Sequence, residues 1–276
     1  MDEFPYVPDP EVWRQQIHKY AKEGAERGAY TLGIGYNHGI VLISQNPYLA
    51  EENYKIHEVH NHIAFVGAGR ASDITRMKEC VILEADVMEL QYAAQDVRAR
   101  DLAHNVLSTL AEERATTMNP LQAVVLLAEI QAHKNMFYKV LFNGEVIPSE
   151  NFASIGGKLS NDYTNWIEEH CKTAYKEGKT LKEAILFGIE CLACAVYEQQ
   201  NEEYDEEPEK KLRDEKQAYT QILRQGQAIE IAVLDRTIKD AIKFTPLSPT
   251  HLRKEFAPLT HEELEEILKN YLPPRR

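Results

Sequence analysis

The feature that most constrains the fold is the grouping of strand-like segments into close pairs. Residues 32–36 alternate apolar with small side chains, Asn37-His38-Gly39 is a turn signal, and residues 40–43 are a continuous apolar run. Strands joined by so few residues pair antiparallel, because a parallel connection needs a crossover of a dozen or more residues. The chain therefore favours antiparallel sheets built from hairpins.

Helical patterns also come in pairs, placed between the groups of strands. Further strand-like segments cover residues 54–59, 62–66, 123–130, 136–142, 152–155 and 229–233, and helical patterns cover 10–24, 70–90, 96–114, 163–174 and 181–196. Each apolar helix face needs a sheet face to pack on. Two stacked antiparallel sheets with helices on both outer sides satisfy this, so we predict an α+β fold, a four-layer αββα sandwich, as one domain over residues 10–250.

The composition indicates a soluble globular protein with an acidic surface. The 276 residues include 31 Lys and Arg against 44 Asp and Glu, which gives a net charge of −13. Such a surface repels phosphate backbones and anionic lipid, so we expect no nucleic-acid and no membrane partner. The chain has no apolar run near the roughly 20 residues of a membrane span, no signal-peptide pattern, and only four scattered cysteines. We expect a cytoplasmic protein.

Three histidines are candidate metal ligands. His57, His60 and His62 lie close together, and imidazole pairs at such spacing hold transition metals in other proteins. No cysteine or well-placed carboxylate completes the set, because Glu58 points to the other face of a strand. Solvated strand histidines are therefore the favoured interpretation, and no metal is expected.

Two other motifs also have plain structural explanations. Cys191 and Cys194 lie inside an apolar helical pattern instead of opening a helix, which favours core packing over redox or zinc chemistry. Residues 67–70, Gly-Ala-Gly-Arg, lack the third glycine of a dinucleotide fingerprint and are not followed by a P-loop lysine. A tight turn explains them equally well, so no nucleotide or other cofactor is expected.

Three segments fall outside the sandwich pattern. Residues 1–9 form a short leader, and the segment from Phe4 to Pro10 contains three prolines, of which Pro10 suits the first position of a helix. An insert at about 198–226 begins with seven acidic and no basic residues, which is typical of a solvated loop or frayed helix. Residues 251–276 contain a capping box and an apolar stripe, so we expect a C-terminal helical extension.

Short motifs recur in a specific order along nearly the whole chain. They are Phe4-Pro5-Tyr6 with Pro10-Glu11, Ala21-Lys22-Glu23-Gly24-x-x-Arg27-Gly28, Gly39-Ile40-Val41-Leu42 reaching Gln45-Asn46-Pro47, Lys55-Ile56-x-Glu58, Ile63-Ala64-Phe65-Val66-Gly67-x-Gly69, Asp96-Val97-x-x-Arg100-x-Leu102-Ala103 and Glu230-Ile231-Ala232-Val233-Leu234-Asp235. In order and spacing they resemble proteasome α subunits, nearest to the actinobacterial-type bacterial form. The resemblance ends at about Phe244 and omits the acidic insert.

The resemblance implies a non-catalytic role within a proteolytic particle. It implies the N-terminal-nucleophile hydrolase fold, a homo-heptameric α ring, partner β subunits that hold threonine nucleophiles, and unfolded protein as substrate. A threonine protease of this class needs an N-terminal threonine whose amine helps activate the hydroxyl, with a carboxylate and a lysine nearby. Alignment with a β subunit puts Ala29 at the nucleophile position and Gln45 at that of the carboxylate. The competing hypothesis is a divergent, self-processing threonine-type peptidase, for which Thr31 is the available residue.

The resemblance also implies two functional sites. Residues Phe4, Pro5, Tyr6, Val7 and Pro8 match the gate, in which seven proline-stiffened segments close the ring axis. Lys55 matches the pocket lysine that receives the C-terminal carboxylate of a regulatory ATPase or other activator. The residues alone also allow plainer interpretations, a disordered terminus for the leader and an ordinary surface lysine at residue 55.

Overall fold

The fold is given by a computed structural model that describes residues 10–46, 53–115, 117, 119–159, 164–200 and 229–247. The predicted leader at 1–9, most of the acidic insert and the predicted C-terminal extension at 251–276 lie outside the described residues. The division of the chain into these segments therefore stays a prediction.

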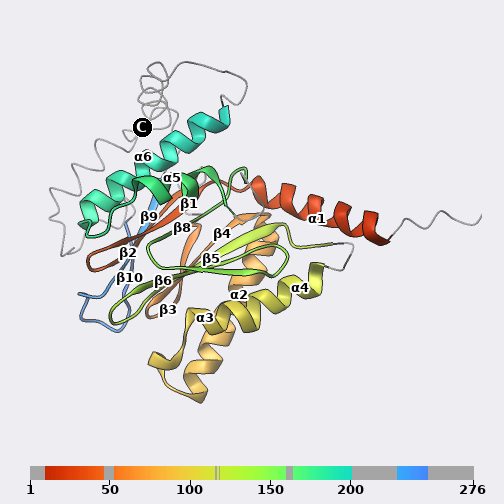
Figure 1. Cartoon of the computed structure of the whole chain (residues 1–276). Helices are drawn as coiled ribbons and strands as arrows, with labels where there is room; N and C mark the ends of the chain where they lie inside the picture. Colours follow the sequence, from red (N-terminus) through yellow and green to blue (C-terminus); the bar gives the residue numbers. More distant parts are fainter. Residues whose placement is uncertain are drawn as a thin grey trace, which may run out of the picture.

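Two five-stranded antiparallel sheets stack on each other (Figure 1). The first sheet has the order β10-β9-β2-β1-β8 and contains β1 (Thr31–Tyr36), β2 (Gly39–Gln45), β8 (Phe152–Ile155), β9 (Ile229–Asp235) and β10 (Phe244–Pro246). The second sheet has the order β3-β4-β5-β6-β7 and contains β3 (Ile56–His60), β4 (Ile63–Gly69), β5 (Ala123–Ile130), β6 (Asn135–Val140) and β7 (Val146–Ser149). The predicted hairpins β1–β2 and β3–β4 are both present.

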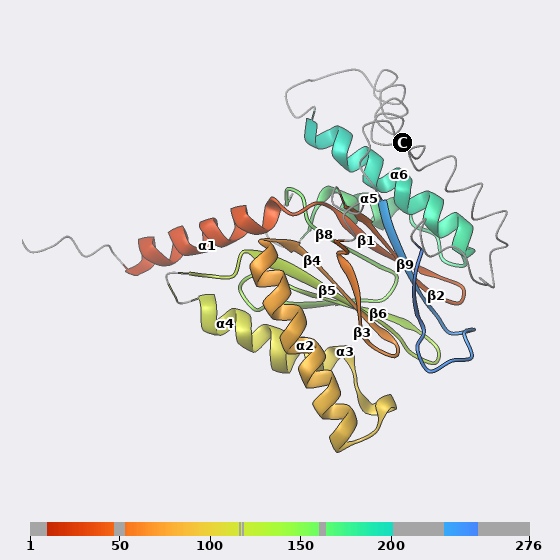
Figure 2. The same ribbon diagram turned by 180° about the vertical axis from the view of Figure 1, so that it is seen from behind.

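Helices cover the outer faces of both sheets (Figures 1 and 2). The first sheet packs against α5 (Trp166–Ala174) and α6 (Leu181–Gln200), and the second against α2 (Ala71–Gln91), α3 (Ala99–Leu102), the π-helical segment η3 (Ala103–Ser108) and α4 (Thr109–Ala115), with the 3₁₀ turn η2 (Ala94–Asp96) between. The predicted αββα sandwich is confirmed. None of the helices within the described residues has the length and apolar character to cross a bilayer.

The inner faces of the sheets form a third core between them. Leu42 of β2 and Leu126 of β5 are fully buried there, as is Phe137 of β6. The first helix, α1 (Pro10–Glu26), adds Ala21 and Ala25 to this core, while the rest of it projects from the end of the sandwich (Figure 1). Most of the large apolar side chains along α1, such as Trp13 and Tyr20, are thus exposed, because only the last turns of the helix reach the sheets.

Two strands and one helix differ from the sequence-based predictions. Both unpredicted strands, β7 and β10, are short edge strands that contain a proline, Pro148 and Pro246. Proline removes a ladder donor and so weakens the strand pattern, but an edge strand tolerates it. The helix predicted at 96–114 is divided into α3, the π-helical segment η3 and α4. Ala103 and Leu107 of η3 and Ala111 of α4 are all buried, so the same side of the divided helix packs on the sheet.

Candidate functional site around Lys55

Four separate segments meet at the end of the first sheet where α1 joins β1. The pairing of β2 with β9 sets Gln45 opposite Ile229 and Ser44 opposite Glu230. Ala29 lies just before β1, and Lys55 immediately precedes β3 of the second sheet. The stacking of the sheets therefore brings Lys55 beside residues that are 10 to 175 positions away in the chain.

The ammonium of Lys55 is held by two backbone carbonyls. Its Nζ donates to Ala29 O at 3.3 Å and to Gln45 O at 3.2 Å. The side chain is half-buried, and the loss of hydration lowers the pKa of Lys55 to about 8, although the nearby Glu230 carboxylate partly counteracts this. A protonated Lys55 is therefore still the main form at neutral pH.

Glu230 is the buried counter-charge of this site. Its carboxylate accepts hydrogen bonds from the backbone N–H of Lys55 at 2.8 Å, from that of Ile56 at 2.9 Å, and from Asn46 Nδ2 at 2.6 Å. Burial raises the pKa of Glu230, and these hydrogen bonds oppose that rise. Glu230 was not among the predicted site residues. The sequence feature that could have indicated it is an acidic side chain in the otherwise apolar stretch 229–234.

The geometry does not supply a nucleophile. At the positions that the resemblance implies for threonine and carboxylate, the chain carries the methyl of Ala29 and the amide of Gln45. Thr31 is fully buried in β1, where its hydroxyl bonds the Ser44 hydroxyl at 2.7 Å.

The rings of His60 and His62 meet edge to face with centroids 5.4 Å apart, and His60 is buried, so the expectation of solvated strand histidines is wrong for that residue. His60 is buried against Glu89, with 3.1 Å between Nε2 and the carboxylate, whereas His62 bonds Val97 O at 3.1 Å. Burial and the nearby Lys78 lower the pKa of His57 to about 4. Among the described residues no three His, Cys, Asp or Glu side chains are placed to hold a metal ion together.

Cys191 and the glycine motif have the structural roles expected of them, whereas the side chain of Cys194 lies outside what the structure describes. Cys191 is buried within α6. Gly69 has φ +123°, and a side chain there would collide with Gln122 O, so the strand-to-helix turn itself requires glycine. The carboxylate of Asp73, bonded by the Arg70 guanidinium at 2.8 and 2.9 Å, occupies the first turn of α2, where a phosphate would otherwise bind.

The predicted gate residues Phe4, Pro5, Tyr6, Val7 and Pro8 lie outside the described residues. The helix that follows them is present and begins at Pro10 as predicted. The gate assignment therefore stays a prediction.

Comparisons with known proteins agree with the fold. A family model described as proteasome subunit matches residues 25–206, which is more than half of the chain. The proteasome subunit alpha of Thermomonospora curvata is 26% identical over 233 residues, covering 84% of this chain and 88% of that protein. The same-named protein of a Nocardioides species is 25% identical over 276 residues, covering 98% and 97%. That of Acidimicrobium ferrooxidans is 30% identical over 155 residues, covering 55% and 66%.

These matches confirm the resemblance to bacterial proteasome α subunits that the sequence motifs indicated. On the family match and the two stacked sheets together, the chain belongs to the proteasome subunit family.

Proposed function

We propose that this chain is a non-catalytic α subunit of a cytoplasmic proteasome core particle. Seven copies would form a ring that admits unfolded protein to the threonine nucleophiles of partner β subunits. The observation that carries the proposal is the surroundings of Lys55: its ammonium donates to the carbonyls of Ala29 and Gln45, and no hydroxyl of the described residues is bonded to it. The family match and the α-type relatives support the same role.

The exposed face of α1 supports ring assembly. Val12, Trp13 and Tyr20 expose 46%, 37% and 54% of their surface on a helix that stands clear of the sandwich (Figure 2). Large apolar side chains on a projecting helix favour burial against another surface. In a ring of identical subunits, the neighbouring copy supplies that surface.

The position of Lys55 supports activator docking. It lies at the end of the sandwich from which α1 projects, so a partner bound there stands beside the helix that carries the predicted gate at its N-terminal end. A lysine ammonium has three N–H donors, and two of them point to Ala29 O and Gln45 O. We infer that the third receives the terminal carboxylate of a regulatory ATPase or another activator.

Intact mass separates the proposal from the peptidase hypothesis. In the native particle the chain should retain Phe4 and Trp13, and purified alone it should cleave no peptide until the cognate β subunit is added. A mature chain that begins at Thr31, or robust cleavage by the isolated chain, would overturn the proposal.

The docking role is tested by two substitutions at one position. Lys55→Met removes the charge and should abolish activator binding to assembled particles, whereas Lys55→Arg keeps a cation and should retain part of it. Native mass spectrometry checks that both variants still form rings. Normal docking by Lys55→Met would show that the carboxylate binds elsewhere.

The gate is tested by deleting residues 1–8. Because the deletion leaves α1 intact, we expect assembly to be unchanged and small-peptide hydrolysis by the particle to rise. Unchanged hydrolysis by an assembled particle would mean that the leader does not restrict access.

A further inference from the structure

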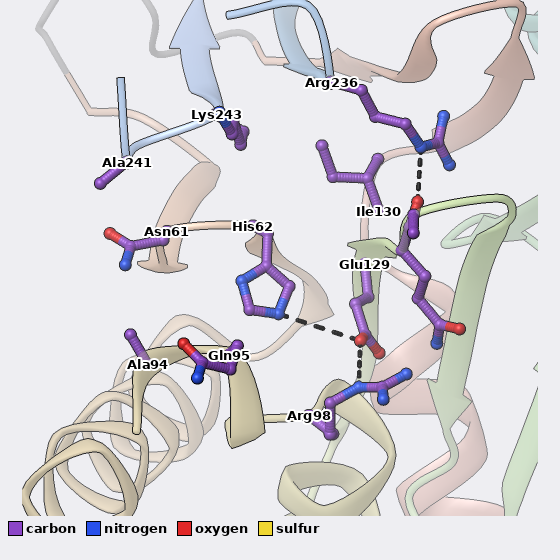
Figure 3. Close-up of a pocket in the computed structure, with 12 residues that line it drawn as sticks. Asn61, His62, Ala94, Gln95, Arg98, Glu129, Ile130, Arg236, Ala241 and Lys243 are labelled. Atoms are coloured by element: carbon purple, nitrogen blue, oxygen red, sulfur yellow. Dashed lines mark hydrogen bonds and ion pairs between the residues drawn. The ribbon is translucent and has the colours of Figure 1, made fainter. Parts of the chain in front are cut away.

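A cavity of about 690 Å³ opens at the end of the sandwich opposite Lys55 (Figure 3). Four stretches build it: the turn between β3 and β4, residues 94–98, the residues at and after the end of β5, and the connection from β9 to β10. Its size lies within the range of small-molecule sites in proteins. None of the residues used by the proposed function lines it.

Cationic side chains dominate the charged groups of this cavity. Arg98, Arg236 and Lys243 line it, and Glu129 is its one lining carboxylate. This excess of positive charge stands out in a chain with a net charge of −13. All three cations are half-buried, so each has lost part of its hydration.

The carboxylate of Glu129 already has partners within the protein. Its carboxylate accepts from Arg98 Nε at 2.6 Å and from the backbone N–H of Ala99 at 3.3 Å, and His62 Nε2 lies 3.9 Å away. Figure 3 shows Arg98 and His62 both directed at it. Glu129 therefore neutralises Arg98, and among the described residues no carboxylate forms a direct ion pair with the other two cations of the cavity.

Arg236 is bound by neutral groups. Its Nε donates to Gln131 O at 2.5 Å, and its Nη2 donates to Lys134 O and Asn135 Oδ1, both at 2.6 Å. These bonds fix the guanidinium at the cavity wall and leave Nη1 without a hydrogen-bonding partner among the described residues. Burial lowers the pKa of Arg236, although the nearby Asp235 carboxylate, which makes no direct ion pair with it, partly counteracts this.

Lys243 is held in the same way. Its Nζ donates to Ile238 O and, at 2.7 Å, to Asp240 O, which are both backbone carbonyls. The nearby Asp235 is buried, and its carboxylate accepts from Tyr36 Oη and from Thr237. Within the described parts of the chain, no carboxylate lies within ion-pair distance of Arg236 or Lys243.

We propose that this cavity binds a small organic anion, with its carboxylate or phosphate group between Arg236 and Lys243. An anion there supplies the direct ion pair that both cations lack among the described residues, and guanidinium and ammonium groups are the usual donors to such oxyanions. Ala94, Ile130 and Ala241 give the cavity an apolar wall for the remainder of the molecule, and the amides of Asn61 and Gln95 offer further hydrogen bonds.

Calorimetric titration of the full-length protein tests the proposal with three probes. AMP presents a phosphate, citrate presents carboxylates, and adenosine is the uncharged match of AMP. We expect AMP, citrate or both to bind, more weakly as salt rises, and adenosine not to bind. Whichever of AMP and citrate binds more tightly shows whether the cavity prefers a phosphate or a carboxylate. The proposal is wrong if neither anion binds below about 10 mM, far weaker than ordinary small-ligand sites, or if adenosine binds as tightly as AMP.

Three variants locate the binding site. Arg236→Gln and Lys243→Gln should each weaken binding about tenfold or more, because each removes a charged donor. Lys239→Gln is the matched control, since Lys239 is an exposed lysine on the same connection that does not line the cavity. If both cavity variants bind the anion as tightly as the unaltered chain does, the proposal is overturned. If neither variant folds, the comparison of AMP with adenosine on the unaltered chain decides the matter.

Discussion

Replacing Lys55 by methionine removes a half-buried ammonium but keeps an unbranched side chain of similar length. Burial lowers the pKa of Lys55 from its ordinary value of 10.5 to about 8 in the folded chain. The unfolded chain therefore holds a proton on this side chain between pH 8 and 10.5 that the folded chain has lost, so stability rises with pH in that window. The corresponding free energy is at most about 3 kcal/mol.

The measurement is urea unfolding of the unaltered protein and of Lys55→Met at several pH values from 7 to 10. Both proteins share every other titrating group, so the difference between their free energies of unfolding isolates Lys55. We expect that difference to move in favour of the unaltered protein by up to about 3 kcal/mol as pH rises through the window. Lys55→Gln, which also lacks the amine but keeps a donor, should show the same pH dependence.

A pH-independent difference would refute this reasoning, because it would mean that the ammonium is not desolvated by its surroundings. The same titration bears on docking. If Lys55 receives a carboxylate, the affinity of the activator should fall as pH rises above about 8, where the free lysine loses its charge.

Three further perturbations have expected outcomes. Glu230→Ala leaves three donors without their acceptor and the Lys55 ammonium without its nearby counter-charge, so unfolding by urea should show a loss of about 3–5 kcal/mol. Lys139→Met leaves the buried Glu168 carboxylate without the Lys139 ammonium, whose Nζ lies 2.5 Å from it, and should lower the free energy of unfolding by about 3 kcal/mol. The double variant Lys139→Met with Glu168→Leu should recover much of that loss. Replacing Trp13 and Tyr20 by serine should leave the unfolding midpoint nearly unchanged, since both are exposed, while native mass spectrometry should show fewer intact rings.

Most of the fold was predictable because its elements carry strong local signals. The hairpin β1–β2 has a glycine-containing turn between apolar runs, and α2 follows a tight turn that requires glycine at residue 69. The edge strands β7 and β10 were not predictable from pattern, because each is short and contains a proline that argues against a strand. They form because the neighbouring strands β6 and β9 offer unpaired backbone groups.

The site was less predictable because its contacts join distant parts of the chain. The resemblance assigned Lys55 a role, but its contacts with Ala29 O and Gln45 O depend on the stacking of two sheets. Glu230 carries no local signal of its partners, since two of its three donors are backbone N–H groups. The cavity beside Arg236 is likewise assembled from the ends of separate strands, and no periodicity in the sequence reports it.

The connection between α1 and β1 gives a physical reason why the chain would keep its first helix. Gly28 O accepts a hydrogen bond from Gly157 N at 2.7 Å, and Ala29 O accepts one from Lys55 Nζ. Cleavage before Ala29 would remove the first acceptor and place a new cationic amine beside the ammonium of Lys55. It would also remove Ala21 and Ala25 from the core between the sheets. A threonine engineered at residue 29 should therefore leave the chain uncut, as intact mass can show, and a new amino end at that position would contradict the argument.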